Sequence, residues 1–154
     1  MTQRLNPFTA ARGAVKAMMA VEKAISESGL DESLLELVRM RASQINGCAF
    51  CLHLHATNAR KAGESEMRLY MLNGWRDSTL YTERERAALA WTEALTMVSG
   101  KGAPDADFER LKAHFDETEQ ANLTMAVGAI NLWNRLQIGV AAEHPAIAGK
   151  FAAA

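Results

Sequence analysis

The 154-residue sequence is poor in proline and aromatic residues, has only two cysteines and contains no long hydrophobic run. Because about 20 consecutive apolar residues are needed to cross a bilayer as a helix, no membrane-spanning helix and no membrane partner are expected. The formal net charge of −1 and the lack of a long basic run argue against nucleic acid as a partner. Sustained alternation of apolar and polar residues is also missing, which disfavours a β-rich fold.

The residues that are present are typical of a globular domain. Hydrophobic residues make up 49% of the chain and charged residues 23%. Such values favour a folded chain over a disordered one. At this length a single domain spanning residues 1–154 can bury a core without disulfides or structural metals.

The N-terminal segment allows two interpretations. Residues 1–21 contain three basic residues and no acid, which faintly resembles an organellar transit peptide. Asn6 before Pro7 favours instead a first helix, with asparagine as the N-cap and proline at the first helical position. No long apolar signal segment is present, so we expect a cytoplasmic, reducing location. There a close pair of cysteines is more often catalytic or metal-binding than structural.

Apolar periodicity and capping residues predict an all-α domain of six or seven helices. The predicted helices cover residues 7–28, 32–46, 48–62, 65–73, 82–98, 107–115 and 116–142, with a loop over 75–79. Glycines stop several of them, and capping boxes begin at Thr82 and Asp116. Apolar residues spread around most of the last helix between Leu123 and Val140. Such a helix is covered on several sides, which favours a homo-oligomer.

Both cysteines lie in one short segment, Cys48-Ala49-Phe50-Cys51, with His55 four residues further on. In a helix, about 100° per residue places Cys48, Cys51 and His55 on one face, with the two Cα atoms about 5–6 Å apart. The helix N-terminus favours a thiolate on Cys48, whereas the histidine favours a thiolate on Cys51. The spacing leaves open which sulfur is the more reactive. His53 points about 200° away from His55 and is expected to be a surface or packing residue.

Glu36 is a further candidate, twelve residues before Cys48 in the preceding predicted helix. It lies beside Leu35 and Val38, on or near the apolar stripe. Burial of an acid there would require a partner, so the pattern alone favours a solvated charge at the edge of the stripe.

Together these residues resemble the signature of the AhpD-like (alkyl hydroperoxidase D, carboxymuconolactone decarboxylase) superfamily, and the resemblance extends over nearly the whole chain. Residues 73–76 and 81–89 are similar to its single-domain members. The resemblance implies an AhpD-like helical fold and trimers or hexamers. It also implies that Cys51 reacts with peroxide and that Cys48 resolves it as a disulfide. His55 and Glu36 would form a proton relay.

One position departs from the family pattern. The well-studied members carry a histidine two residues after the first cysteine, where this chain has Phe50. A polar group of the relay is therefore replaced by an aromatic one.

The expected function is that of a thiol-dependent peroxidase or disulfide reductase that needs no cofactor and no metal. Its partners would be a hydroperoxide substrate and a lipoyl or thioredoxin-like dithiol reductant. Three alternatives stay open: a lyase that decarboxylates a lactone, a zinc site built on Cys48, Cys51 and His55, and a helical scaffold without redox turnover. Structural zinc usually takes its ligands as two spaced pairs, and a second pair is missing here.

Overall fold

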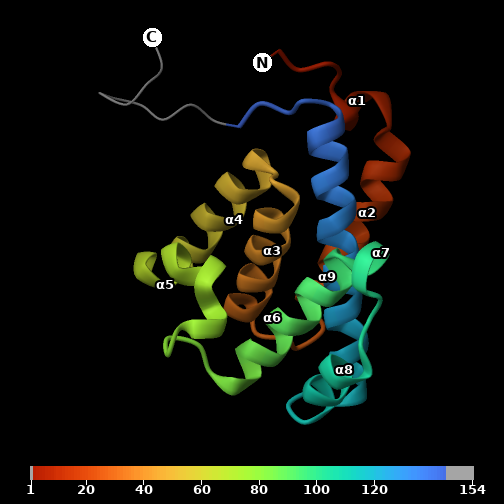
Figure 1. Ribbon diagram of the computed structural model, residues 1–154. Helices are drawn as coiled ribbons and strands as arrows, with labels where there is room; N and C mark the ends of the chain where they lie inside the picture. The colour runs from red at the N-terminus through yellow and green to blue at the C-terminus, as the bar shows by residue number, and fades with distance from the viewer. Residues whose placement is uncertain (1, 145–154) are drawn as a thin grey trace.

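The computed structural model describes residues 2–144, which fold into helices without a strand (Figure 1). This confirms the predicted all-α class. The described helices are α1 Pro7–Ala10, α2 Arg12–Ser26, α3 Glu32–Asn46, α4 Ala49–Lys61, α5 Glu66–Met71, the 3-10 helix η1 Leu72–Asp77, α6 Glu83–Thr96, α7 Val98–Lys101, α8 Asp105–Lys112 and α9 Glu117–Gly139. None of the helices among residues 2–144 has both the length and the apolarity to cross a bilayer.

Helix α3 is the central element of the fold. It begins at the N-cap Asp31, whose carboxylate accepts hydrogen bonds from two backbone N–H groups, and ends at Gly47, which has a positive φ of 69°. It packs against α4, α6 and α9 (Figure 1). Because neighbours surround it, its apolar residues are buried all round: Leu34, Leu35, Leu37, Val38, Met40 and Ala42. The polar residues of α3 that face inward therefore need partners.

All seven predicted helices are present, with some differences. The first is broken at Ala11 between α1 and α2, the fourth passes from α5 into η1 at Leu72, and the fifth ends as α6 at Thr96, before the short α7. The predicted loop over 75–79 is partly wrong, because the chain continues as η1 through Gly74. The physical reason is Trp75, which is buried and donates its indole N–H to Glu93 Oε1 at 2.8 Å. Its burial draws the segment onto the core.

Helix α9 is held by the predicted capping box, in which the side chains of Asp116 and Glu119 accept from each other's backbone N–H groups. Figure 1 shows it beside α3 and α2. Its apolar residues are not all covered within one chain, since Met125 is 54% exposed and Leu132 44% exposed. The homo-oligomer stays a prediction.

Candidate functional site

The two cysteines meet at the N-terminus of α4. The helix begins one residue later than predicted, at Ala49, and Cys48 is its N-cap, accepting from the Cys51 N–H at 3.4 Å. The two sulfurs are 2.7 Å apart and both cysteines are buried free thiols. Since a disulfide needs about 2.05 Å, only a small approach would close the bond.

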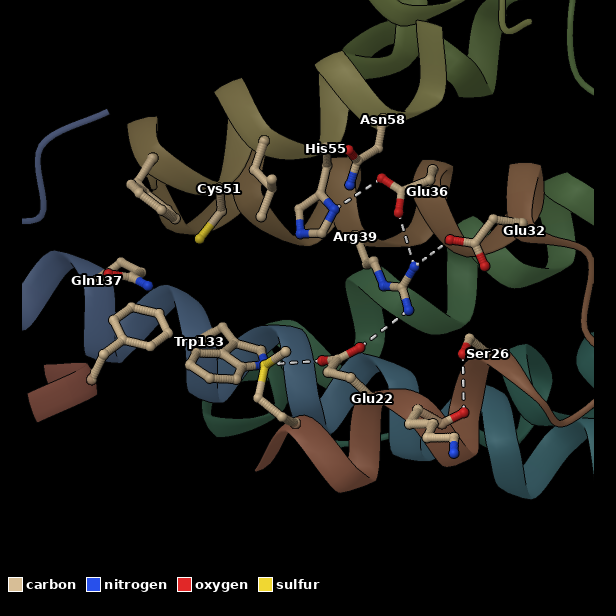
Figure 2. A pocket seen from close by; sticks show the side chains of 15 residues that line it. Glu22, Ser26, Glu32, Glu36, Arg39, Cys51, His55, Asn58, Trp133 and Gln137 are labelled. Carbon is tan, nitrogen blue, oxygen red and sulfur yellow. Dashed lines mark hydrogen bonds and ion pairs between the residues drawn. The ribbon is translucent and has the colours of Figure 1, made fainter. Parts of the chain in front are cut away.

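A cavity of about 530 Å³ opens beside this pair, between α4 on one side and α2 and α9 on the other (Figure 2). Cys51 lines the cavity whereas Cys48 does not. Much of the wall is apolar and includes Phe8, Met19, Phe50, Leu54 and Trp133. Phe50 thus forms part of the wall at the position where the family pattern has a histidine.

Glu36 and His55 come together on the same cavity. His55 Nδ1 lies 2.9 Å from Glu36 Oε2, and Glu36 is only 2% exposed. The solvated position that the pattern favoured for Glu36 is therefore wrong. Burial is tolerated because its second oxygen accepts from Arg39 Nη1 at 2.9 Å, so that both carboxylate oxygens are paired.

The environment keeps Glu36 ionised. Burial alone would raise its pKa, but the hydrogen bond and charge of His55 and the charge of Arg39 outweigh it and hold the pKa below its ordinary value. A carboxylate at this place holds the Nδ1 side of the imidazole, which leaves the Nε2 side for the cavity. Among residues 2–144 no hydrogen bond joins His55 to either sulfur, so a proton passing between them needs a bridging molecule.

Arg39 is a site residue that the sequence reasoning missed. Its guanidinium binds Glu22 at 3.1 Å and Glu32 at 3.0 Å as well as Glu36, and Glu22 also accepts from the Trp133 indole N–H at 2.9 Å (Figure 2). The available signal was the spacing of Glu36 and Arg39, which are three residues apart on one helix. The cluster fixes the position of the Glu36 carboxylate.

The two thiols have opposite pKa shifts. A hydrogen bond from the Cys51 thiol, with help from the Cys51 backbone N–H and the Asn134 amide, overcomes burial and lowers the pKa of Cys48 to about 7. The same shared hydrogen bond, together with burial, raises the pKa of Cys51. The first thiolate of the reduced pair therefore forms on Cys48, at the helix N-terminus. Cys48 therefore carries the negative charge, whereas Cys51 is the sulfur that faces the cavity.

The thiolate on Cys48 can be measured directly. We expect one thiolate per reduced chain, half formed at about pH 7, because Cys48 loses its proton near that value. Thiolate absorbance at about 240 nm, followed against pH, gives this midpoint. The low-pH midpoint should be lost in Cys48→Ser. A wild-type midpoint near the ordinary thiol value of about 8.5 would contradict it.

Two further possibilities from the sequence were a role for His53 and a metal site. His53 stacks on His144, with ring centroids 5.5 Å apart, and does not line the cavity. Among residues 2–144 no group of three or more His, Cys, Asp or Glu side chains is arranged to hold a metal ion.

Comparison with known proteins gives the family. A model of the Carboxymuconolactone decarboxylase family matches residues 12–94, more than half of the chain and the whole stretch from Glu36 to His55. The chain belongs to the carboxymuconolactone decarboxylase family. The AhpD-like superfamily that the sequence motifs indicated is thereby confirmed.

Similar proteins extend this family match over most of the chain. The crystal structure of ATU0492 from Agrobacterium tumefaciens, a protein of unknown function provisionally named an antioxidant defence protein AhpD, is 44% identical, with a TM-score of 0.92 over 95% of this chain and 100% of that one. The uncharacterized protein YdfG from Bacillus subtilis is 38% identical over 91% of this chain and 95% of its own length. An uncharacterized peroxidase-related protein from Silicibacter is 26% identical, with a TM-score of 0.73 over 82% of this chain and 67% of that one.

Proposed function

We propose that this protein is a thiol-dependent peroxidase that reduces organic hydroperoxides with the Cys48–Cys51 pair. One observation supports this most strongly: a cavity lined by Cys51 and by a buried Glu36–His55 pair, with the Cys48 sulfur 2.7 Å behind Cys51. The names of the Agrobacterium and Silicibacter proteins, an antioxidant defence protein and a peroxidase-related protein, are consistent with it.

The first step takes place at Cys51, the sulfur that meets the cavity. Its proton passes to the Cys48 thiolate across 2.7 Å, which moves the negative charge to Cys51. The Cys51 thiolate attacks the terminal oxygen of the hydroperoxide, the O–O bond breaks, and Cys51 becomes a sulfenic acid. The proton that Cys48 gave up reaches the Nε2 side of His55 through a bridging molecule, and Glu36 stabilises the imidazolium that forms. The leaving alkoxide takes this proton and departs as the alcohol.

The second step closes the disulfide. The Cys48 sulfur attacks the Cys51 sulfur while its proton passes to the sulfenic oxygen, so that an S–S bond forms and that oxygen leaves as water. One hydroperoxide has then oxidised two thiols. An external dithiol, of the lipoyl or thioredoxin type, restores both thiols by two exchanges and leaves as its own disulfide.

The cavity wall indicates a neutral, apolar substrate. The three carboxylates of Glu22, Glu32 and Glu36 outnumber the two cations on the wall, Lys23 and Arg39. Arg39, moreover, pairs with all three of those carboxylates, which offset its attraction for a substrate anion. With its aromatic wall the cavity suits an alkyl or aryl hydroperoxide without charge.

A matched pair of substrates tests this preference. We expect a fatty-acid hydroperoxide to react more slowly than its methyl ester, by about tenfold in kcat/KM. The reason is repulsion between the substrate carboxylate and the carboxylates of the cavity wall. A repulsion of about 1.4 kcal/mol corresponds to a tenfold lower rate. Glu32→Gln removes a carboxylate at the partly exposed end of the cluster. It should reduce the ratio of kcat/KM for the ester to kcat/KM for the acid. Equal rates for acid and ester would contradict the neutral-substrate assignment.

The function itself is tested by hydroperoxide consumption with dihydrolipoamide, thioredoxin or glutathione as the donor. The double variant Cys48→Ser with Cys51→Ser is the control. Wild-type turnover with at least one dithiol and none in the double variant supports a peroxidase. The Glu36–His55 pair alone is acid–base machinery, so a lyase acting on a carboxylated lactone is the second candidate. Lactone turnover that survives in the double variant would favour the lyase.

A further inference from the structure

Asn134 is a fully buried polar residue of α9 that neither the family motif nor the mechanism above uses. Its side chain sits in a hydrogen-bonded network at the back of the dithiol. The Oδ1 atom accepts from Asn46 Nδ2 at 2.9 Å, and Nδ2 donates to Ser43 Oγ at 3.0 Å. Both partners come from α3, the helix that ends just before Cys48.

The network fixes which way the Asn134 amide points. Ser43 donates its own hydroxyl hydrogen to the Arg39 carbonyl at 2.7 Å, so it must accept from Asn134. Asn46 presents an NH₂ group, which requires an oxygen opposite it. The NH₂ group of Asn134 therefore lies on the Ser43 side and keeps one N–H that Ser43 does not use.

Ser43 connects this amide to the dithiol, because its hydroxyl accepts from Asn134 and its backbone carbonyl accepts from the Cys48 N–H at 3.1 Å. Ile130, one turn earlier on α9, packs against Cys48 and Cys51 in a buried cluster that Trp133 also joins. Asn134 thus extends from the part of α9 that covers the dithiol. A donor at this place favours the charged form of each sulfur, and Asn134 acts to lower the pKa of both thiols. The same Asn134 N–H can therefore stabilise a thiolate on Cys48 or on Cys51.

We propose that Asn134 is a catalytic residue that stabilises the thiolate on whichever of the two sulfurs carries the charge. Its role in turnover rests on the proposed peroxidase function, whereas its effect on the thiols does not. In reductive exchange an external thiolate attacks one sulfur of the disulfide, the S–S bond breaks, and its electron pair stays on the other sulfur. Asn134 donates to that leaving thiolate, which favours the reduced pair.

Two variants and a matched control test the proposal. Asn134→Leu removes the donor at similar volume, and Asn134→Asp keeps the acceptor toward Asn46 but places a like charge beside the sulfurs. Asn131→Leu is the control, because Asn131 shares the Asn46 partner at 3.0 Å but gives both hydrogens of its own amide to Thr96 and Val127. The readouts are the thiolate midpoint at 240 nm and the dithiol–disulfide equilibrium in a dithiothreitol redox buffer.

We expect both Asn134 variants to raise the thiolate midpoint by about one pH unit and to make the disulfide about tenfold harder to reduce. The control should keep the wild-type values. Asn134→Asp decides the question if Asn134→Leu does not fold. A folded Asn134 variant with an unchanged midpoint and equilibrium, even at reduced thermal stability, overturns the proposal and leaves Asn134 a structural residue. Neither readout uses peroxide, so a shifted midpoint without peroxide turnover would sink the peroxidase function alone.

Discussion

Replacing Cys51 by serine is expected to abolish hydroperoxide consumption, by more than about 10³-fold relative to the wild type. Cys51 is the cysteine that lines the cavity, so it is the sulfur that an organic hydroperoxide reaches first. A serine hydroxyl is close in size to the thiol but cannot be oxidised to a sulfenic acid and is not ionised at neutral pH. The measurement is peroxide consumption with excess dihydrolipoamide.

Cys48→Ser is the matched control, since it removes the partner sulfur and leaves Cys51 in the cavity. Without a thiol donor it should consume about one hydroperoxide per chain, leave a sulfenic acid on Cys51 that dimedone traps, and then stop. The reversed pattern would contradict the assignment of roles. A single turnover in Cys51→Ser, with dimedone on Cys48, would mean that the more acidic sulfur is also the one that peroxide reaches.

Replacing Arg39 by methionine is expected to lower the free energy of unfolding by about 3–5 kcal/mol. The Arg39 side chain is 8% exposed and pairs with three carboxylates, of which Glu36 is 2% exposed. Methionine fills much of the volume but leaves Glu36 buried with only His55 as a partner. The penalty therefore comes from uncompensated buried charge rather than from lost packing. Urea unfolding at pH 7 measures it.

The loss in the Arg39 variant should depend on pH. Arg39 helps to depress the pKa of Glu36, so the stability gained from this ionised carboxylate is present above its unfolded pKa and is lost as the pH falls through the folded one. The difference between wild type and variant should therefore be largest at neutral pH and shrink as the pH falls below about 4.5 and through the lowered folded pKa of Glu36. A difference independent of pH would contradict this electrostatic explanation.

Arg41→Met provides a control for general destabilisation. Arg41 is also on α3 and also forms a largely buried ion pair, with Glu93 at 2.8 Å, but it does not line the cavity. Both arginine variants should lose stability. We expect only the Arg39 variant to change the pH dependence of peroxide turnover, because only Arg39 touches Glu36.

Much of the fold could be predicted because local signals and tertiary packing agree. The N-caps Asn6 and Asp31, the capping boxes at Thr82 and Asp116, and the stop at Gly47 all lie where the sequence placed them. The segment after Gly74 could not be predicted from turn residues, since the buried Trp75 and its bond to Glu93 override them. That bond joins residues 18 positions apart, beyond the reach of local patterns.

The site was predictable only in part, for the same reason. Spacing alone placed Cys48 at the start of a helix, with His55 on the face of Cys51. The partnership of Glu36 with His55 came from the family resemblance, whereas periodicity favoured a solvated Glu36. Asn134 could not have been found from spacing, because its partner Ser43 lies 91 residues away in the sequence.

The reactive sulfur shows what the structure adds to a motif. From the sequence, the helix terminus favoured Cys48 and the histidine favoured Cys51. In the structure the two properties separate, since Cys48 holds the first thiolate and Cys51 faces the cavity. The two sulfurs are 2.7 Å apart, so a proton can pass between them and move the charge from Cys48 to Cys51.

A single-turnover reaction is the decisive measurement. Fully reduced protein is mixed with one equivalent of cumene hydroperoxide without any donor, and peptide mass spectrometry and product analysis follow the thiols and the alcohol. We predict one alcohol released per chain and, at the same rate, one disulfide between Cys48 and Cys51. Unreacted hydroperoxide together with two intact thiols would contradict a peroxidase built on this pair.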